Sequence, residues 1–262
     1  MIHQEFANSA AEILKADDKV IGLAVAGSWL TNELDEFSDL DLILVTHQRI
    51  SHDKNLMLDY AKRLGTFLSG FTGEHVGEPR VLICLYDNPL LHVDIKFLTL
   101  EEFPFRIETP TLLLDKKRQL EKVISNSEPE FPYPDYQWIE DRFWIWIHYA
   151  LLKIGRGEYF EAYDFFGFLR LVVFGPLLHI KNNSLPRGVR KAETALSRDD
   201  LDQLKLTLPG YDRQSLSDRL RNAVALYRQL RTVLYDSKVQ LQQDTEKKVM
   251  SYFDEIEKRK SA

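Results

Sequence analysis

The chain has 262 residues, of which 44% are hydrophobic, 12 are glycine and 10 are proline, and this composition excludes collagen-like, disulfide-scaffold and wholly disordered proteins. Its formal net charge is -6, so the chain as a whole lacks the positive field expected of a protein that binds nucleic acid or an anionic membrane. The negative charge lies in the first third: residues 1–100 hold 8 Lys and Arg against 15 Asp and Glu, whereas residues 101–262 hold 26 against 25.

Residues 1–100 predict a small mixed sheet with helices packed on it. Apolar residues at helical spacing predict helices, and short apolar runs that end at turn-forming residues predict buried strands. In chain order, the predicted elements are a helix over 3–16, a strand over 20–27, a short helix or turn, a strand over 39–45, a helix over 53–68, and strands over 80–87 and 90–98. This order, αβαβαββ, indicates helices packed on a sheet.

The remainder of the chain predicts a helical bundle. Pro129, Pro132 and Pro134 lie close together, so we place the domain boundary there, between an αβ domain over 1–126 and an α-helical domain over 135–262. After the prolines, helical periodicity predicts helices over 138–154, 159–181, 199–206, 214–236 and 239–259, and a short element near 187–196. The predicted fold class is therefore α+β, a small mixed β-sheet domain followed by an α-helical bundle domain.

The sequence also predicts a cytoplasmic protein. Cys84 is the only cysteine, so it cannot form an intramolecular disulfide, and residues 1–18 have neither the basic nor the apolar segment of a secretion signal. The best apolar run, 143–154, contains His148 and Lys153 and is shorter than the roughly 18 residues that a membrane-spanning helix needs. We therefore expect no membrane partner.

Two acidic residues on one predicted strand supply a signal for metal chemistry. Asp39 and Asp41 are two residues apart, so both side chains leave the same face of the strand, with backbones about 6.6 Å apart. Their charges repel each other, and the residues that follow, 42–45, are all apolar and offer no basic partner. A divalent metal ion is the natural compensation.

Asp94 extends this argument to a second strand. It lies between apolar neighbours, where an isolated acid is costly unless it is paired or bound to a ligand. Three acids on two strands can hold two Mg²⁺ ions, the arrangement used for in-line phosphoryl or nucleotidyl transfer. The alternative for Asp94 is a salt bridge to Lys96, its neighbour on the same face of the strand.

Gly27 and Ser28 fit the other half of such a site. Glycine lets the backbone approach a triphosphate closely, and the free N–H groups of the turn, together with the Ser28 hydroxyl, can hold phosphate oxygens. The acids would hold the metals and this turn would hold the phosphates.

Together these residues carry a family resemblance. The pattern of Gly27-Ser28, ten intervening residues, Asp39-Leu40-Asp41 and a later strand acid at Asp94 resembles the signature of the DNA polymerase β-type nucleotidyltransferase superfamily. The αβ domain followed by a helical domain further resembles the antibiotic (aminoglycoside and lincosamide) nucleotidyltransferases and their uncharacterised relatives. The superfamily motif covers residues 20–98, a little under a third of the chain.

The resemblance implies transfer of a nucleoside monophosphate, usually AMP from ATP, to a hydroxyl group, with release of pyrophosphate. Asp39, Asp41 and Asp94 are then the metal ligands for two Mg²⁺ ions, and Asp94 is also a candidate general base. Helical domains of this superfamily supply a cation to the β- and γ-phosphates, a role for which Lys153 and Arg156 are the candidates. The alternative for these two residues is a favourable position at a helix C-terminus.

The helix over 138–154 is the candidate acceptor surface. Its periodicity leaves Glu140, Asp141 and Trp144 outside the buried face, and an exposed Trp beside acids suggests a substrate wall. Fourteen of the 30 aromatic residues fall between 131 and 168, which suits a cationic or ring-bearing acceptor. The alternatives are that the aromatic rings fill the core of the bundle and that the acids are simply solvated.

The sequence thus predicts a Mg²⁺-dependent adenylyltransferase acting on a small polar acceptor, for which an aminoglycoside-like polycation is a candidate. A protein-modifying enzyme of the toxin-antitoxin type and a catalytically silent nucleotide-binding protein are the alternatives. The expected partners are a nucleoside triphosphate and a small molecule, with nucleic acid not expected because no basic stripe is present, and the chain is expected to be a monomer or a homodimer.

Overall fold

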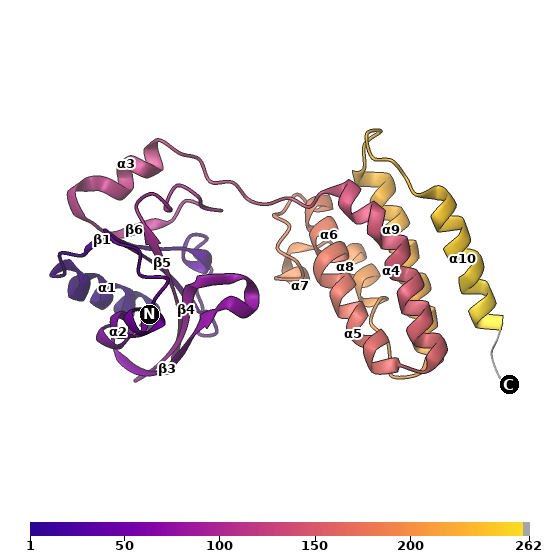
Figure 1. Cartoon of the computed structure of the whole chain (residues 1–262), viewed down its shortest axis with the longest axis horizontal. Coiled ribbons are helices and arrows are strands. Elements are labelled where there is room, and N and C mark those ends of the chain that lie inside the picture. The colour runs from indigo at the N-terminus through magenta and orange to yellow at the C-terminus, as the bar shows by residue number, and fades with distance from the viewer. Residues whose placement is uncertain (259–262) are drawn as a thin grey trace. The chain divides into compact units, whose positions relative to one another are not determined.

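The computed structural model describes residues 1–258, which form two compact units (Figure 1). The first unit is Met1–Phe131 and the second begins at Pro132, within the proline-rich segment. Residues 259–262 lie outside the described residues. The helical domain predicted over 135–262 and the helix predicted over 239–259 both end in these residues.

The first unit is built on a six-stranded mixed sheet with the strand order β3-β4-β5-β2-β1-β6. Strands β2 and β5 run parallel, and the other neighbouring pairs are antiparallel. The strands are β1 (Val20–Val25), β2 (Leu40–Thr46), β3 (Thr66–Gly73), β4 (Glu78–Asp87), β5 (Leu91–Thr99) and β6 (Thr111–Asp115). A parallel β2–β5 pair in the middle of the sheet places the beginnings of these two strands at the same edge.

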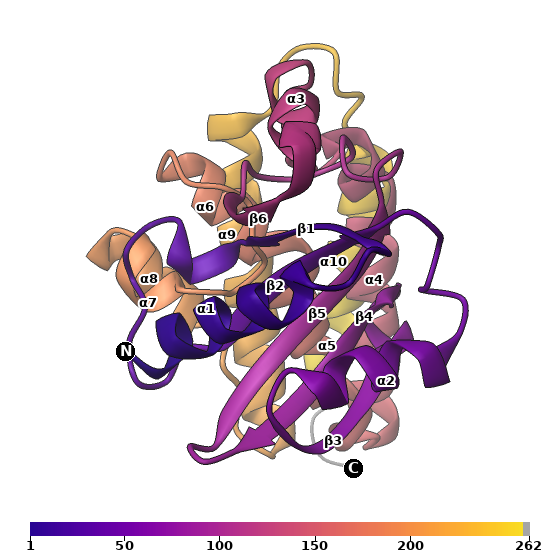
Figure 2. The ribbon, with the colours of Figure 1, turned by 90° about the vertical axis from the view of Figure 1, so that its left-hand side faces the viewer.

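Helices cover both faces of this sheet. Helices α1 (Ile2–Lys15) and α2 (Lys54–Arg63) pack on one face (Figure 2), in a core that includes alternate residues of β2 and β5. Helix α3 (Gln119–Ser125) packs through Leu120 against Val45 and other residues that face the opposite side. Because side chains alternate along a strand, the residues between the buried positions of β2 and β5 point to the face that α1 and α2 leave uncovered.

Two strands of this sheet were missed by the sequence prediction. The helix predicted over 53–68 ends at Arg63 as α2, and the following residues belong to β3, which pairs with β4. Strand β6 was likewise not predicted, and it pairs with β1 at the other edge of the sheet. The predicted short helix or turn after β1 is the 3₁₀ helix η1 (Gly27–Trp29) followed by turns.

All regular elements of the second unit within residues 132–258 are helices, which confirms the predicted fold class. The short element predicted near 187–196 is the single turn α7, and the helix predicted over 159–181 is divided by a π-helical segment into α5, η4 and α6. The other predicted helices are present, and their described ends differ from the prediction by a few residues. The elements are α4 (Tyr136–Arg156), α5 (Tyr159–Leu169), the π-helical η4 (Arg170–Phe174), α6 (Gly175–Lys181), α7 (Ala192–Ala195), α8 (Arg198–Lys205), α9 (Arg213–Leu234) and α10 (Gln243–Lys258).

Helix α4 packs against several other helices of this unit, namely α5, α9 and α10. The Asp135 side chain accepts hydrogen bonds from the backbone N–H groups of Gln137 and Trp138 and so begins the helix, and Gly157 ends it with φ +76°. The run Tyr159–Lys181 is long and apolar enough to be a candidate membrane span by length and composition, and half of its apolar window is buried inside the unit. That burial is expected of a helix in the core of a folded domain.

Candidate functional site

The structure brings the three predicted acids together on the face of the sheet opposite α1 and α2. Asp41 on β2 and Asp94 on β5 are direct partners in the parallel register, and Asp39 immediately precedes β2. One oxygen of each carboxylate can be chosen so that all three lie within 4.8 Å of one another, and all three residues are half-buried. The parallel pairing therefore turns two distant sequence motifs into one cluster of negative charge.

The donor set of this cluster fits a hard divalent cation. Three carboxylate groups supply oxygen ligands only, which suits Mg²⁺ and not the sulphur and nitrogen sites preferred by zinc. Three like charges this close together repel one another, and a bound divalent cation would reduce this repulsion. Asp39, Asp41 and Asp94 are the residues that would hold it.

Lys96, the alternative partner of Asp94, forms its ion pair elsewhere. Its ammonium lies 2.8 Å from Glu78 Oε2. The hydrogen bond from Arg80, reinforced by Lys96, lowers the pKa of Glu78 to about 2. Asp94 instead has the ring of His92 beside it, with Nε2 3.0 Å from Asp94 Oδ1. His92 is two residues before Asp94 and therefore on the same face of β5, so strand alternation alone would have identified it.

The Gly27 turn lies directly against the acidic cluster. The Ala26 N–H donates to the Asp41 carbonyl oxygen at 3.0 Å, which ties the end of β1 to β2. Gly27 then adopts φ +64°, and a Cβ atom built on it would lie 2.0 Å from Asp41 Oδ2. Only glycine permits both this conformation and this approach. The half-buried Ser28 follows Gly27 in η1, so the predicted Gly-Ser pair and the three acids are neighbours in space.

We expect Gly27→Ala to weaken binding of Mg²⁺ by about 10- to 100-fold, the loss typical when the support of a metal ligand is removed. The added methyl group would lie 2.0 Å from Asp41 Oδ2, so the Asp41 carboxylate must shift from its place in the cluster. Gly77→Ala is the matched control, since Gly77 has φ +78° and no atom lies within 4 Å of the position that its added methyl group would take. Calorimetry of both variants separates the two effects, because equal losses would assign the cause to backbone strain and not to Asp41.

Two further residues contact this site and have no sequence signal that identifies them. Glu108, in the segment between β5 and β6, accepts a hydrogen bond from the Gly27 N–H at 2.8 Å although it is 81 positions away in the chain. His3, on α1 and only 2% exposed, lies with Nε2 2.7 Å from the carbonyl oxygen of Ser38, and so holds the residue that precedes Asp39. Both contacts depend on tertiary structure that local patterns do not encode.

The predictions that Glu140 and Trp144 are exposed are wrong. Both side chains are buried in the helical unit, at 0% and 1% exposure. Glu140 accepts hydrogen bonds from the Tyr227 hydroxyl at 2.6 Å and from Arg231 Nη1 at 3.2 Å, and Trp144 Nε1 lies 3.3 Å from Glu140 Oε1. An ion pair and hydrogen bonds satisfy the Glu140 charge inside the core, which is why this acid can lie in the buried stripe of α4.

The other three candidates on the helical unit lie at its surface or near it. Asp141 is exposed and accepts hydrogen bonds from two glutamine side chains, which lower its pKa. Lys153 Nζ lies 2.8 Å from Glu158 and 2.9 Å from Glu161, and these carboxylates raise the pKa of Lys153. Arg156 lies 3.8 Å from Glu158 in a weaker pair.

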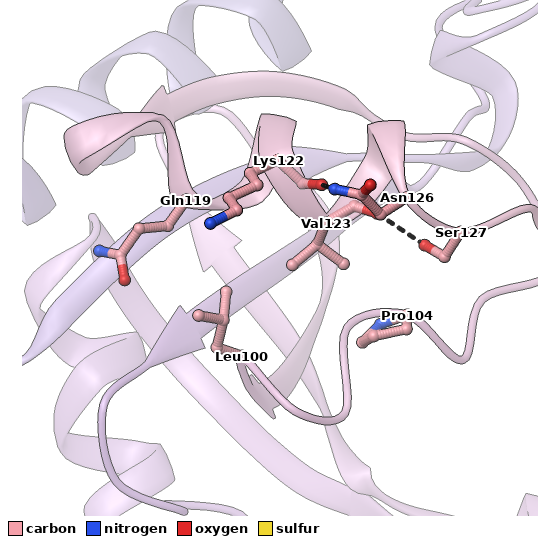
Figure 3. Close-up of a pocket in the computed structure, with 7 residues that line it drawn as sticks. All are labelled: Leu100, Pro104, Gln119, Lys122, Val123, Asn126 and Ser127. Carbon is pink, nitrogen blue, oxygen red and sulfur yellow. Dashed lines mark hydrogen bonds between the residues drawn. The ribbon is translucent and has the colours of Figure 1, made fainter.

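A pocket of about 450 Å³ lies between α3 and the segment that follows β5 (Figure 3). Its wall includes the Asn126 side chain, which donates to the Lys122 carbonyl oxygen, and the Ser127 hydroxyl, which donates to the Val123 carbonyl oxygen. None of the predicted site residues lines this pocket. The lining residues are Leu100, Pro104, Gln119, Lys122, Val123, Asn126 and Ser127.

Comparison with known proteins finds similarity in structure and not in sequence. No family model and no curated protein matches the sequence. The structure is similar to an aminoglycoside 6-adenyltransferase from Bacillus subtilis, with 16% identity and a TM-score of 0.42 over 97% of this chain and 98% of that chain. It is also similar to a nucleotidyltransferase-like protein from Exiguobacterium sibiricum 255-15, with 12% identity and a TM-score of 0.36 over 87% of this chain and 75% of that chain.

Proposed function

We propose that this protein is a Mg²⁺-dependent nucleotidyltransferase that transfers AMP from ATP to a hydroxyl group of a small polar acceptor. The observation that carries the proposal is the convergence of Asp39, Asp41 and Asp94 beside the Gly27 turn, with carboxylate oxygens within 4.8 Å of one another. Transfer from a nucleoside triphosphate requires two features, a cluster of acids that binds cations and a neighbouring backbone turn that binds phosphates.

The residues of the first unit divide the chemistry between them. Bound Mg²⁺ would neutralise the triphosphate and lower the pKa of the acceptor hydroxyl. Asp39 and Asp41 hold the cation in place, and Asp94 is the candidate that takes the proton from the acceptor hydroxyl. The Nε2 atom of His92, 3.0 Å from Asp94 Oδ1, orients that carboxylate. The proposed phosphate contacts are the side chain of Ser28 and the backbone N–H of Gly27, which donates to Glu108 in the nucleotide-free protein.

The charge distribution favours a cationic acceptor. Residues 1–100 carry 15 acidic against 8 basic side chains, so the surroundings of the acidic cluster attract a polycation such as an aminoglycoside. Asp141 remains a proposed contact for the acceptor, and Lys153 and Arg156 remain proposed contacts for the β- and γ-phosphates, for which they must exchange their present carboxylate partners. The proposal includes a cytoplasmic location, no membrane or nucleic-acid partner, and a monomer or homodimer.

The test is to incubate the protein with ATP and Mg²⁺ in the presence of a panel of acceptors, and to measure pyrophosphate release and the mass gained by each acceptor. Pyrophosphate release that EDTA abolishes, together with one adenylate on a small hydroxyl compound, supports the proposal. ATP binding without pyrophosphate release favours a silent nucleotide-binding protein, and adenylate on a protein hydroxyl favours the protein-modifying alternative. Absence of any ATP binding contradicts all three.

A further inference from the structure

The Gly27 N–H that the proposed function assigns to a phosphate group already has an anionic partner in the chain. Glu108 Oε1 accepts its hydrogen bond at 2.8 Å. A carboxylate oxygen and a phosphate oxygen are chemically alike as acceptors, since both are anionic and both bind a backbone N–H more strongly than a neutral oxygen does. The Gly27 N–H therefore already binds an anionic oxygen of the kind that a phosphate group would supply.

Glu108 lies close to the cluster of Asp39, Asp41 and Asp94. Gly27 lies against both carboxylates: its N–H donates to Glu108, and Asp41 Oδ2 occupies the side of its Cα where other residues carry a Cβ atom. Glu108 Oε1 is 2.8 Å from the Gly27 nitrogen, and Asp41 Oδ2 is 2.0 Å from the position that a Cβ atom on Gly27 would take. Since that nitrogen and that position are both about 1.5 Å from the Gly27 Cα, the two oxygens lie no more than about 8 Å apart. Glu108 thus adds a fourth negative charge near the cluster of Asp39, Asp41 and Asp94.

The segment that carries Glu108 is held at both ends and exposed between them. Arg106 donates hydrogen bonds to the Ser127 hydroxyl at 2.6 Å and to the Ser127 carbonyl oxygen at 2.5 Å, and Pro110 is buried. Between these anchors, Ile107 is 53% exposed and Glu108 is half-buried. The middle of this segment is exposed between its anchors, so we expect the Glu108 side chain to be able to leave Gly27 while the anchors stay in place.

We propose that Glu108 is an internal competitor of the nucleotide, which occupies the Gly27 N–H in the nucleotide-free protein and is displaced when a phosphate group binds there. This inference rests on the proposed function. The phosphate group and the Glu108 carboxylate require the same donor, and as like charges they also repel each other. Glu108 therefore weakens the affinity for the triphosphate and makes nucleotide entry depend on movement of its side chain away from Gly27.

Removal of this competitor is expected to tighten nucleotide binding. With Glu108→Ala, we expect the dissociation constants of a non-hydrolysable ATP analogue and of tripolyphosphate, each with Mg²⁺, to fall about tenfold, the value of one charge-assisted hydrogen bond. The affinity for adenosine, which has no phosphate, should be unchanged. Glu108→Gln keeps an amide acceptor for Gly27 but loses the charge, so its affinities should lie between those of the wild type and Glu108→Ala.

Isothermal titration calorimetry of the full chain tests this, with Glu101→Ala as the control because Glu101 is an exposed acid that also lies between β5 and β6. Tighter phosphate binding in the Glu108 variants alone supports the proposal. If the wild type binds the ATP analogue but neither Glu108 variant binds it more tightly, or the Glu101 variant gains equally, the inference is overturned and the proposed function stands. If no protein binds the analogue, both fail. Should Glu108→Ala not fold, Glu108→Gln decides alone.

Discussion

Replacing Asp41 with asparagine is expected to lower the rate of nucleotidyl transfer by about a thousandfold or more, the effect of losing several kcal/mol of transition-state stabilisation. Asparagine keeps the shape of the side chain and removes its charge, so the backbone pairing of Asp41 with Asp94 in the sheet is preserved. The cluster loses one of the three carboxylates that converge within 4.8 Å. The loss should appear in pyrophosphate release and, independently, in the calorimetric affinity for Mg²⁺.

The control for this variant is Asp59→Asn on α2. Asp59 is exposed and forms an ion pair with Lys62 at 3.8 Å, and such surface pairs contribute little to stability. Mg²⁺ should raise the melting temperature of the wild type and of the Asp59 variant, because a ligand that binds only the folded state stabilises it, and should leave that of the Asp41 variant nearly unchanged. Wild-type activity of the Asp41 variant would remove the acidic cluster from the mechanism.

The central strands of the sheet could be predicted from the sequence because their burial follows a simple pattern. Residues of β2 and β5 alternate between a buried face and the face that carries the acids, so spacing alone indicates that Asp39 and Asp41 share a side. Spacing does not indicate which strands are neighbours. The family resemblance grouped Asp94 with the other two acids, and the structure shows the parallel pairing that opposes Asp94 to Asp41.

The edge strands were missed because their sequences carry little of this pattern. Strand β3 contains Gly70 and Gly73 and is exposed at many positions, and it is held as a strand by its pairing with β4. Leu64 and Phe67 fit the helical spacing of α2, so the prediction extended the helix through Gly65 and into the strand. Long-range hydrogen bonding to β4 thus decides the structure of this segment, because it stabilises an extended conformation even where the local sequence favours a helix.

The error at Glu140 and Trp144 has a different cause, the number of neighbours around α4. The prediction assumed one buried stripe, but α4 packs against α5, α9 and α10, which bury a much wider face of the helix. The partner of Glu140, Arg231, is 91 residues further along the chain. Periodicity therefore predicted that Glu140 is solvated, although its charge is neutralised inside the core. It also predicted that Trp144, which lies against Glu140, is exposed.

Replacing Glu140 with alanine is expected to destabilise the protein by about 3 to 5 kcal/mol, the usual cost of removing one partner of a buried ion pair. The change leaves Arg231 without the carboxylate at 3.2 Å, and removes the acceptor of the Tyr227 hydroxyl and of the Gln242 backbone N–H. Arg231 keeps its second partner, Glu246, at 2.9 Å, which sets the loss toward the lower end of this range. Urea unfolding followed by circular dichroism measures the change.

Asp141, the residue next to Glu140, provides the control that distinguishes an acid of the core from an acid that contacts the acceptor. Asp141→Ala removes an exposed carboxylate that accepts hydrogen bonds from two glutamine side chains, so it should leave the free energy of unfolding nearly unchanged. If Glu140→Ala were as stable as the wild type and instead lost affinity for the acceptor, Glu140 would be an acceptor ligand and not a core residue. A large loss of stability for Glu140 alone restricts the proposed acceptor contacts on α4 to Asp141.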